Sequence, residues 1–192
     1  QYAIESYERL EAETGQGVSF HQTGGLRVAF TELEMEALRT QFGAARYLGY
    51  PMELISPAEA AAYNPLYDFT GALGAIWTQG EGHVDPSGVT TAFAAGARAR
   101  GAEISRHNRV LDVSQRSNGE WQVVTEKGTV TCEHVVNAAG CYAHQVGQLC
   151  GVDVPQANVL HHYLVTDEVP ELVAAKESSG WEMPVMRDNR IA

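Results

Sequence analysis

Apolar residues recur at helical spacing close to the start of the chain. Ile4, Tyr7 and Leu10 are three residues apart, polar and charged residues lie between them, and glycines follow at positions 15 and 17. Apolar side chains at this spacing share one face of a helix, and glycine commonly ends a helix. The pattern therefore predicts an amphipathic helix over residues 2–14.

Three further helices are marked by residues that can satisfy the free backbone N–H groups of a first helical turn. Thr31 and Ser56 each stand three positions before a Glu, which is the arrangement of a capping box, and a proline follows Ser56. Asp85 precedes another proline and a run of small and apolar residues. We expect a helix from Thr31 to about residue 46, a short helix after Ser56, and a helix from Asp85 up to residue 101.

Short segments rich in β-branched and aromatic residues, bounded by turn-forming residues, predict strands. Residues 18–22 and 26–30 flank a Thr-Gly-Gly turn and are interpreted as a hairpin, whereas residues 109–132 contain three such segments and are interpreted as a β-meander. Further strands are expected at residues 75–77, 102–105, 159–166 and 184–188.

Residues 135–143 combine a short strand, a turn of small residues and the start of a helix. Two valines suit a strand that is buried on both faces, and Ala138, Ala139 and Gly140 leave the backbone accessible where the strand ends. In open α/β sheets, ligands bind at that end of the strands. Close packing of a strand against a helix explains the same small residues, so both interpretations stay open from these residues alone.

Helices and strands alternate along the chain, with a β-meander between two of the helices. This order indicates an α/β fold. The character of the sequence changes near residues 17, 83 and 155. Two interleaved domains, one of them made from discontinuous segments, would produce these changes.

Composition narrows the possible partners. Of the 192 residues, 44% are hydrophobic and 19% charged, as in a globular protein, and the net charge is -11. Nucleic acids and anionic membranes select clustered Lys and Arg, so neither is expected as a partner. No run approaches the ~18 apolar residues of a membrane span. The three cysteines form no C-x-x-C pair, so we expect no disulfides, no metal site and a reducing compartment.

Histidine and arginine supply the candidate chemistry. His161 and His162 are adjacent on a predicted strand, so they face opposite sides of it and cannot both bind one metal ion. One of them, with Tyr163 on the other face from it, could point into a cavity and orient a polar substrate, whereas the structural alternative is a histidine satisfied within a sheet. Arg187 suits a substrate carboxylate, but a buried structural ion pair with Asp188 or a neighbour is an equally open interpretation.

Two further histidines are interpreted as structural, and one motif typical of dinucleotide binding is missing from these residues. His21 and His83 are expected to have structural roles, and His83 is expected to make only local hydrogen bonds beside a helix cap. No G-x-G-x-x-G motif follows a strand, so these residues lack a complete dinucleotide-binding unit. The chain begins without Met, inside a predicted helix, and we therefore expect it to be a piece of a longer protein.

Six segments follow one another in an order typical of a known family. They are residues 20–27, 82–86, 94–102, 136–140, 161–166 and 184–188. Together they resemble the FAD-dependent amine oxidoreductases of the D-amino-acid-oxidase-like superfamily, most of all the dimethylglycine and sarcosine dehydrogenases. The resemblance implies an FAD-binding α/β domain, partial here, interleaved with a substrate domain built on a mixed sheet. Residues 1–16 and 84–153 would belong to the first domain, and residues 17–83 and 154–192 to the second.

The resemblance also implies roles for single residues. His161 matches the active-site histidine of the members that oxidise dimethylglycine, with His162 as the second choice. Tyr163 and Arg187 would contact the substrate. The residues that would contact the cofactor, with Tyr142 at a position where the family usually has Trp, are Val110, Ala138, Ala139, Gly140 and Tyr142.

The activity implied by the resemblance is oxidative N-demethylation of a small methylated glycine. FAD would be the cofactor, tetrahydrofolate would bind to a region outside these residues, and the enzyme would act in a bacterial cytoplasm or a mitochondrial matrix. Because the glycine-rich unit is missing, we expect the isolated chain to be inactive and to bind FAD poorly. The alternatives are another amine or glycerol-3-phosphate oxidoreductase of the same fold, and a non-catalytic docking subunit or truncated piece.

Overall fold

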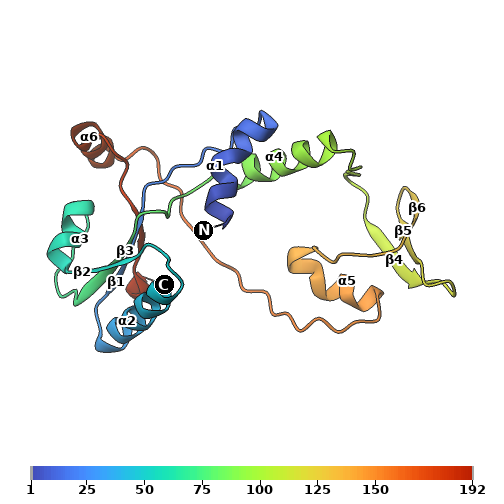
Figure 1. Cartoon of the computed structure of the whole chain (residues 1–192), viewed down its shortest axis with the longest axis horizontal. Coiled ribbons are helices and arrows are strands. Elements are labelled where there is room, and N and C mark those ends of the chain that lie inside the picture. Colours follow the sequence, from blue (N-terminus) through green and yellow to red (C-terminus); the bar gives the residue numbers. More distant parts are fainter. Residues whose placement is uncertain (1, 192) are drawn as a thin grey trace. The chain divides into compact units, whose positions relative to one another are not determined.

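The computed structural model of the chain describes residues 2–191 and contains two compact units (Figure 1). The first unit is made of Gln1–Glu103 and Thr166–Ala192, and the second of Ile104–Val165. The first holds a mixed four-stranded sheet with helices, and the second holds a three-stranded antiparallel sheet and a helix. The predicted α/β fold class is therefore confirmed.

The mixed sheet of the first unit has the strand order β2-β3-β1-β7. Its central strand β1 pairs antiparallel with β3 and parallel with β7, so a strand from near the end of the sequence completes a sheet begun near its start (Figure 1). The strands are β1 (Gly25–Ala29), β2 (Glu53–Ile55), β3 (Gly74–Thr78) and β7 (Val185–Arg187).

Two apolar clusters form on this sheet, because successive side chains of a strand point to opposite faces. Helix α3 (Pro57–Tyr63) contributes to one cluster and helix α2 (Glu32–Tyr47) to the other. The buried residues of the α3 cluster are Leu26, Val28, Ala60 and Ala75. Those of the α2 cluster are Ala29, Met35, Leu38 and Ile76.

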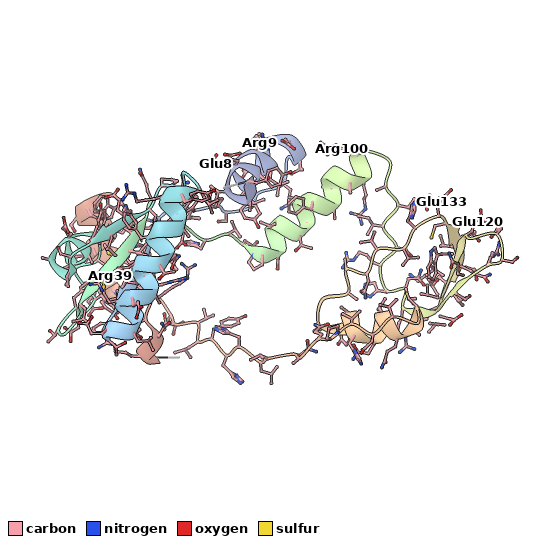
Figure 2. All side chains as sticks on the ribbon, turned by 60° about the horizontal axis from the view of Figure 1, so that its bottom comes forward. Glu8, Arg9, Arg39, Arg100, Glu120 and Glu133 are labelled. Atoms are coloured by element: carbon pink, nitrogen blue, oxygen red, sulfur yellow. The ribbon has the colours of Figure 1, made fainter. Side chains whose placement is uncertain are left out.

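A third apolar cluster joins α1 (Tyr2–Thr14) to α4 (Pro86–Ala99). Leu10 on α1 packs with Val89 and Ala92 on α4. Figure 2 labels Arg9 on α1 and Arg100 after α4, and both guanidinium groups lie within 4 Å of the Glu13 carboxylate. The unit also contains α6 (Pro170–Ser179) and the short 3₁₀ turn η2 (Asn189–Ile191).

The second unit is a meander followed by a helix. Its strands are β4 (Val110–Gln115), β5 (Trp121–Thr125) and β6 (Gly128–Cys132), and its helical elements are the 3₁₀ turn η1 (Gly140–Tyr142) and α5 (Ala143–Leu149). All strand pairs in it are antiparallel, as the sequence predicts. Within residues 2–191, no helix combines the length and the apolar character that a membrane span requires.

The predicted helix starts are confirmed. Thr31 and Ser56 each form a complete capping box with the Glu three residues later. The carboxylate of Asp85 accepts hydrogen bonds from the backbone N–H groups of Ser87 and Gly88, both at 2.9 Å. Local chemistry thus fixes these three helix starts.

The predicted hairpin of residues 18–22 and 26–30 is wrong. Strand β1 pairs with β3 on one edge and β7 on the other, so no edge remains for residues 18–22. Of those residues, His21 alone has a β-bridge, and its partner is His83. Sequence spacing favoured the nearest segment, whereas pairing between distant segments prevails in the structure.

Three other predicted strands are not formed: residues 102–105, the valines at 135 and 136, and residues 159–166. Val136 is 85% exposed and Val159 is 88% exposed. A strand exists only through pairing with a neighbour, and no segment within residues 2–191 pairs with these three. The two compact units have other boundaries than the predicted interleaved domains. The division into interleaved domains remains a prediction.

A polar network follows β7 and ties the C-terminal segment to the α3 side of the sheet. The Asp188 carboxylate accepts hydrogen bonds from the Arg190 guanidinium, at 2.8 to 3.2 Å, and from the Tyr67 hydroxyl. The same guanidinium stacks over the Phe30 ring at 3.2 Å from its centroid. Hydrogen bonds from Arg190, then from Tyr67, hold the pKa of the Asp188 carboxyl well below its usual range.

We predict that Asp188→Asn destabilises the fold more at neutral pH than in acid. The native pKa of Asp188 is lowered, so its contribution to stability is complete above the unfolded-state pKa of about 4 and declines as the pH falls below it. Urea unfolding at pH 7 and pH 3 measures the difference, with the exposed Asp167→Asn as the control. An equal loss of stability at both pH values would contradict the assigned role of the charge.

Candidate functional site

The residues assigned to the cofactor lie in the second unit. Val110 opens β4 and is half-buried, while residues 138–140 form a turn that leads into η1. Gly140 has φ 56°, a left-handed conformation that other residues adopt at a cost. The small side chains at 138 and 139 leave the backbone of this turn accessible.

The exposed side chain of Asn137 binds backbone groups on both sides of the turn. Its side-chain N–H donates to the Ala143 carbonyl at 2.8 Å, and its carbonyl oxygen accepts from the Ala139 N–H at 3.3 Å. The Gln156 side chain donates to the Gly140 carbonyl at 3.0 Å. Sequence reasoning missed Asn137 and Gln156 as positioning residues, although an Asn directly before small turn residues is a recognised turn signal.

Tyr142 ends η1 and is 66% exposed. An accessible backbone turn and an exposed aromatic ring leave surface against which a flat ring system such as a flavin can lie. The residues therefore fit one wall of a flavin site. Their roles as flavin contacts stay predictions.

The three residues at 161–163 lie in a segment without secondary structure, and all of them are exposed. The Tyr163 side chain is 84% exposed. The prediction that His161 and His162 face opposite sides of a strand does not apply, since no strand forms here. Their catalytic and substrate-binding roles remain predictions.

Arg187 lies on β7 in the first unit, where its guanidinium forms an ion pair with the Glu81 carboxylate. Asp188 pairs with Arg190 instead of Arg187. Of the interpretations left open by the sequence, the ion pair with a neighbour is present, and that neighbour is Glu81. About 44% of the Arg187 side chain is exposed.

A cavity of about 500 Å³ opens in the first unit beside the first residues of β1. The rings of Tyr63 and Trp77 stack in its wall with centroids 4.1 Å apart. Its acidic lining groups are Glu53 and Glu182. The complete lining is His21, Gln22, Thr23, Gly24, Glu53, Tyr63, Trp77, Gln79, Trp181, Glu182 and Pro184.

His21 and His83 meet at the edge of this cavity, and the expectation of purely local bonds for His83 is wrong. Their rings stack with centroids 4.9 Å apart, and both face the Glu182 carboxylate. This close approach requires a glycine at position 82, because a Cβ there would overlap the backbone of His21. Sequence spacing alone cannot bring together positions 21, 83 and 182.

Known proteins are similar in sequence to nearly the whole of this chain. The sequence matches the DAO family, FAD dependent oxidoreductase, over residues 1–191. Mitochondrial dimethylglycine dehydrogenase from Mus musculus is 38% identical over 186 residues, which are 97% of this chain and 21% of that protein. Mitochondrial sarcosine dehydrogenase from Mus musculus is 31% identical over 165 residues, which are 83% of this chain and 18% of that protein.

A solved structure agrees with these matches. L-proline dehydrogenase from P. horikoshii has a TM-score of 0.70 and 30% sequence identity, with 77% of this chain and 39% of that chain covered. The chain spans about a fifth of the length of the two mitochondrial relatives. On the evidence of the mixed sheet and of a family match over nearly every residue, this chain belongs to the DAO family of FAD-dependent oxidoreductases.

Proposed function

We propose that this chain forms part of an FAD-dependent enzyme that oxidatively demethylates a small N-methylated glycine, of the dimethylglycine or sarcosine type. The observation that carries the proposal is the similarity to dimethylglycine dehydrogenase along almost the entire chain. The likeness to sarcosine dehydrogenase supports the same substrate class. The proposal also includes three finer points, which are the specific amine, the compartment and any use of tetrahydrofolate.

The second unit would supply one wall of the flavin site. The backbone at Val110 would contact the adenine end, and the turn at 138–140 with Tyr142 would lie beside the cofactor. When bound, FAD supplies the oxidant for the N-methyl carbon of the substrate. The protein's contribution is to orient the amine and to set its protonation.

His161 is the residue proposed to manage the amine proton, with His162 as the second choice. A protonated nitrogen has no free lone pair to assist the loss of hydride from its methyl group, so a neighbouring base promotes the reaction. An imidazole can accept that proton near neutral pH. Tyr163 would lie beside the same substrate.

Arg187 is proposed to bind the substrate carboxylate, since a guanidinium can hold both oxygens of such a group. In the structure this guanidinium is paired with Glu81. Substrate binding at Arg187 thus requires the carboxylate to share the guanidinium with Glu81 or to replace it.

Oxidation of a different amine, such as the secondary amine proline, is the second candidate, and the likeness to L-proline dehydrogenase favours it. A substrate screen with the flavin-loaded enzyme that carries this chain separates the two. We expect dimethylglycine or sarcosine to be oxidised with release of formaldehyde, and proline and glycerol 3-phosphate to react poorly. Preferred oxidation of proline or glycerol 3-phosphate would overturn the proposed substrate class.

We predict that His161→Gln in that enzyme lowers kcat/KM for the methylated glycine by about 100-fold, because proton management contributes roughly that much. The matched variant His162→Gln should have a smaller effect. Steady-state kinetics over a range of pH measure both. Wild-type kinetics in His161→Gln would remove this residue from the mechanism.

We also predict that the purified 192-residue chain binds added FAD only weakly, because it has no glycine-rich turn for the pyrophosphate. Flavin fluorescence and the visible absorbance of the desalted protein measure retention. A yellow protein with stoichiometric FAD would show that the residues present suffice for binding.

A further inference from the structure

Three side chains from distant parts of the sequence converge at the edge of the cavity in the first unit. They are His21, His83 and Glu182, and one potential metal-binding atom from each lies within 4.8 Å of the others. Two imidazoles and one carboxylate form the ligand set of several zinc sites. This cluster is separate from every residue assigned above to flavin or substrate.

The two histidines are held opposite each other by backbone pairing. The N–H of His21 donates to the His83 carbonyl at 2.9 Å, and the N–H of His83 donates to the His21 carbonyl at 3.0 Å. Residues paired in this way project their side chains from the same face. The two rings are nearly parallel, with an interplanar angle of 11°. The backbone thus holds the two imidazoles next to each other.

Glu182 supplies the acidic partner. Its Oε2 lies 2.9 Å from Nδ1 of His21 and 3.6 Å from Nε2 of His83. In a tetrahedral zinc site the donor atoms are about 3.3 Å apart, since Zn–N and Zn–O bonds are about 2.0–2.2 Å long. The two distances lie on either side of that value, and because the two rings are stacked, one imidazole has to turn for both nitrogen lone pairs to point at the same ion.

Neighbouring groups support the ligands in the manner of a metal site, where outer hydrogen bonds orient each ligand. Nζ of Lys176 binds the other carboxylate oxygen of Glu182, Oε1, at 2.6 Å, and this bond is the main cause that lowers the pKa of the Glu182 carboxyl. Nε2 of His21 lies 3.2 Å from Oγ of Ser19. Ser19 has φ 47°, a strained backbone conformation of the kind that gathers at functional sites.

We propose that His21, His83 and Glu182 bind a divalent transition-metal ion such as Zn²⁺. The three side chains are 40%, 54% and 27% exposed, so an ion can reach them from solution. The adjoining cavity leaves room for a fourth ligand, either water or a small molecule. Bound metal ties the segment before β7 to the bridge between positions 21 and 83, and it therefore stabilises the first unit.

Titration of the chelator-treated chain with ZnCl₂ by isothermal calorimetry tests the proposal. We expect one site per chain, a rise in Tm with added Zn²⁺, and visible absorption bands from bound Co²⁺. The double variant His21→Gln/His83→Gln should lose all three signals. The exposed histidine variant His134→Gln should keep them.

Circular dichroism of each variant without metal shows whether the fold is retained, and Glu182→Gln provides a second variant that leaves both imidazoles in place. Loss of the Zn²⁺ site in Glu182→Gln, with an unchanged spectrum, would support the proposal. Equal Zn²⁺ binding by the wild type and the double variant would overturn it, as would loss of the site in His134→Gln.

Discussion

The double pairing of β1 is the constraint on which the first unit depends. This strand is bonded to β3 on one edge and to β7 on the other, and its residues are almost fully buried. Burial on both faces and pairing on both edges leave its backbone polar groups few partners other than the two neighbouring strands. Segments separated by more than a hundred residues are thereby fixed in one register.

That register places the charged side chains of the C-terminal segment beside residues of the sheet and its neighbouring loops. Opposite the start of β1, Glu182 comes beside the two bridged histidines, while Arg187 reaches Glu81 and Asp188 reaches Tyr67. None of these pairs is close in sequence. The contacts of Glu182, Arg187 and Asp188 are therefore consequences of the pairing of β7 with β1.

Local signals in the sequence predicted helix starts reliably, whereas the pairing of strands that are distant in the sequence was not predicted. The capping boxes at Thr31 and Ser56 and the cap at Asp85 predicted helix starts, because each depends on atoms within one turn. The hairpin of residues 18–22 failed, because β7 holds the edge that it needed. Residues 159–166 have the composition of a strand without a paired neighbour in the described part of the chain.

The candidate site residues also fall into a group that the sequence predicted and a group that only the fold brings together. Family resemblance led to the predictions of a flavin contact at residues 138–140 and of a catalytic role for His161, which stay predictions, whereas the family itself is confirmed. The His21, His83 and Glu182 cluster had no signature in the sequence, since its members come together only through the bridge and the β1–β7 pairing. A cluster whose members are distant in the sequence cannot be predicted from the sequence pattern before the fold is known.

Amide hydrogen exchange measured by mass spectrometry tests most directly whether β7 completes the sheet on β1. The Val185 N–H donates to the Gly24 carbonyl at 3.0 Å, and the parallel register extends to Arg187. We expect slow exchange in peptides that cover residues 25–29 and 185–187, and fast exchange in residues 159–165. Exchange of residues 185–187 as fast as that of residues 159–165 would contradict this expectation.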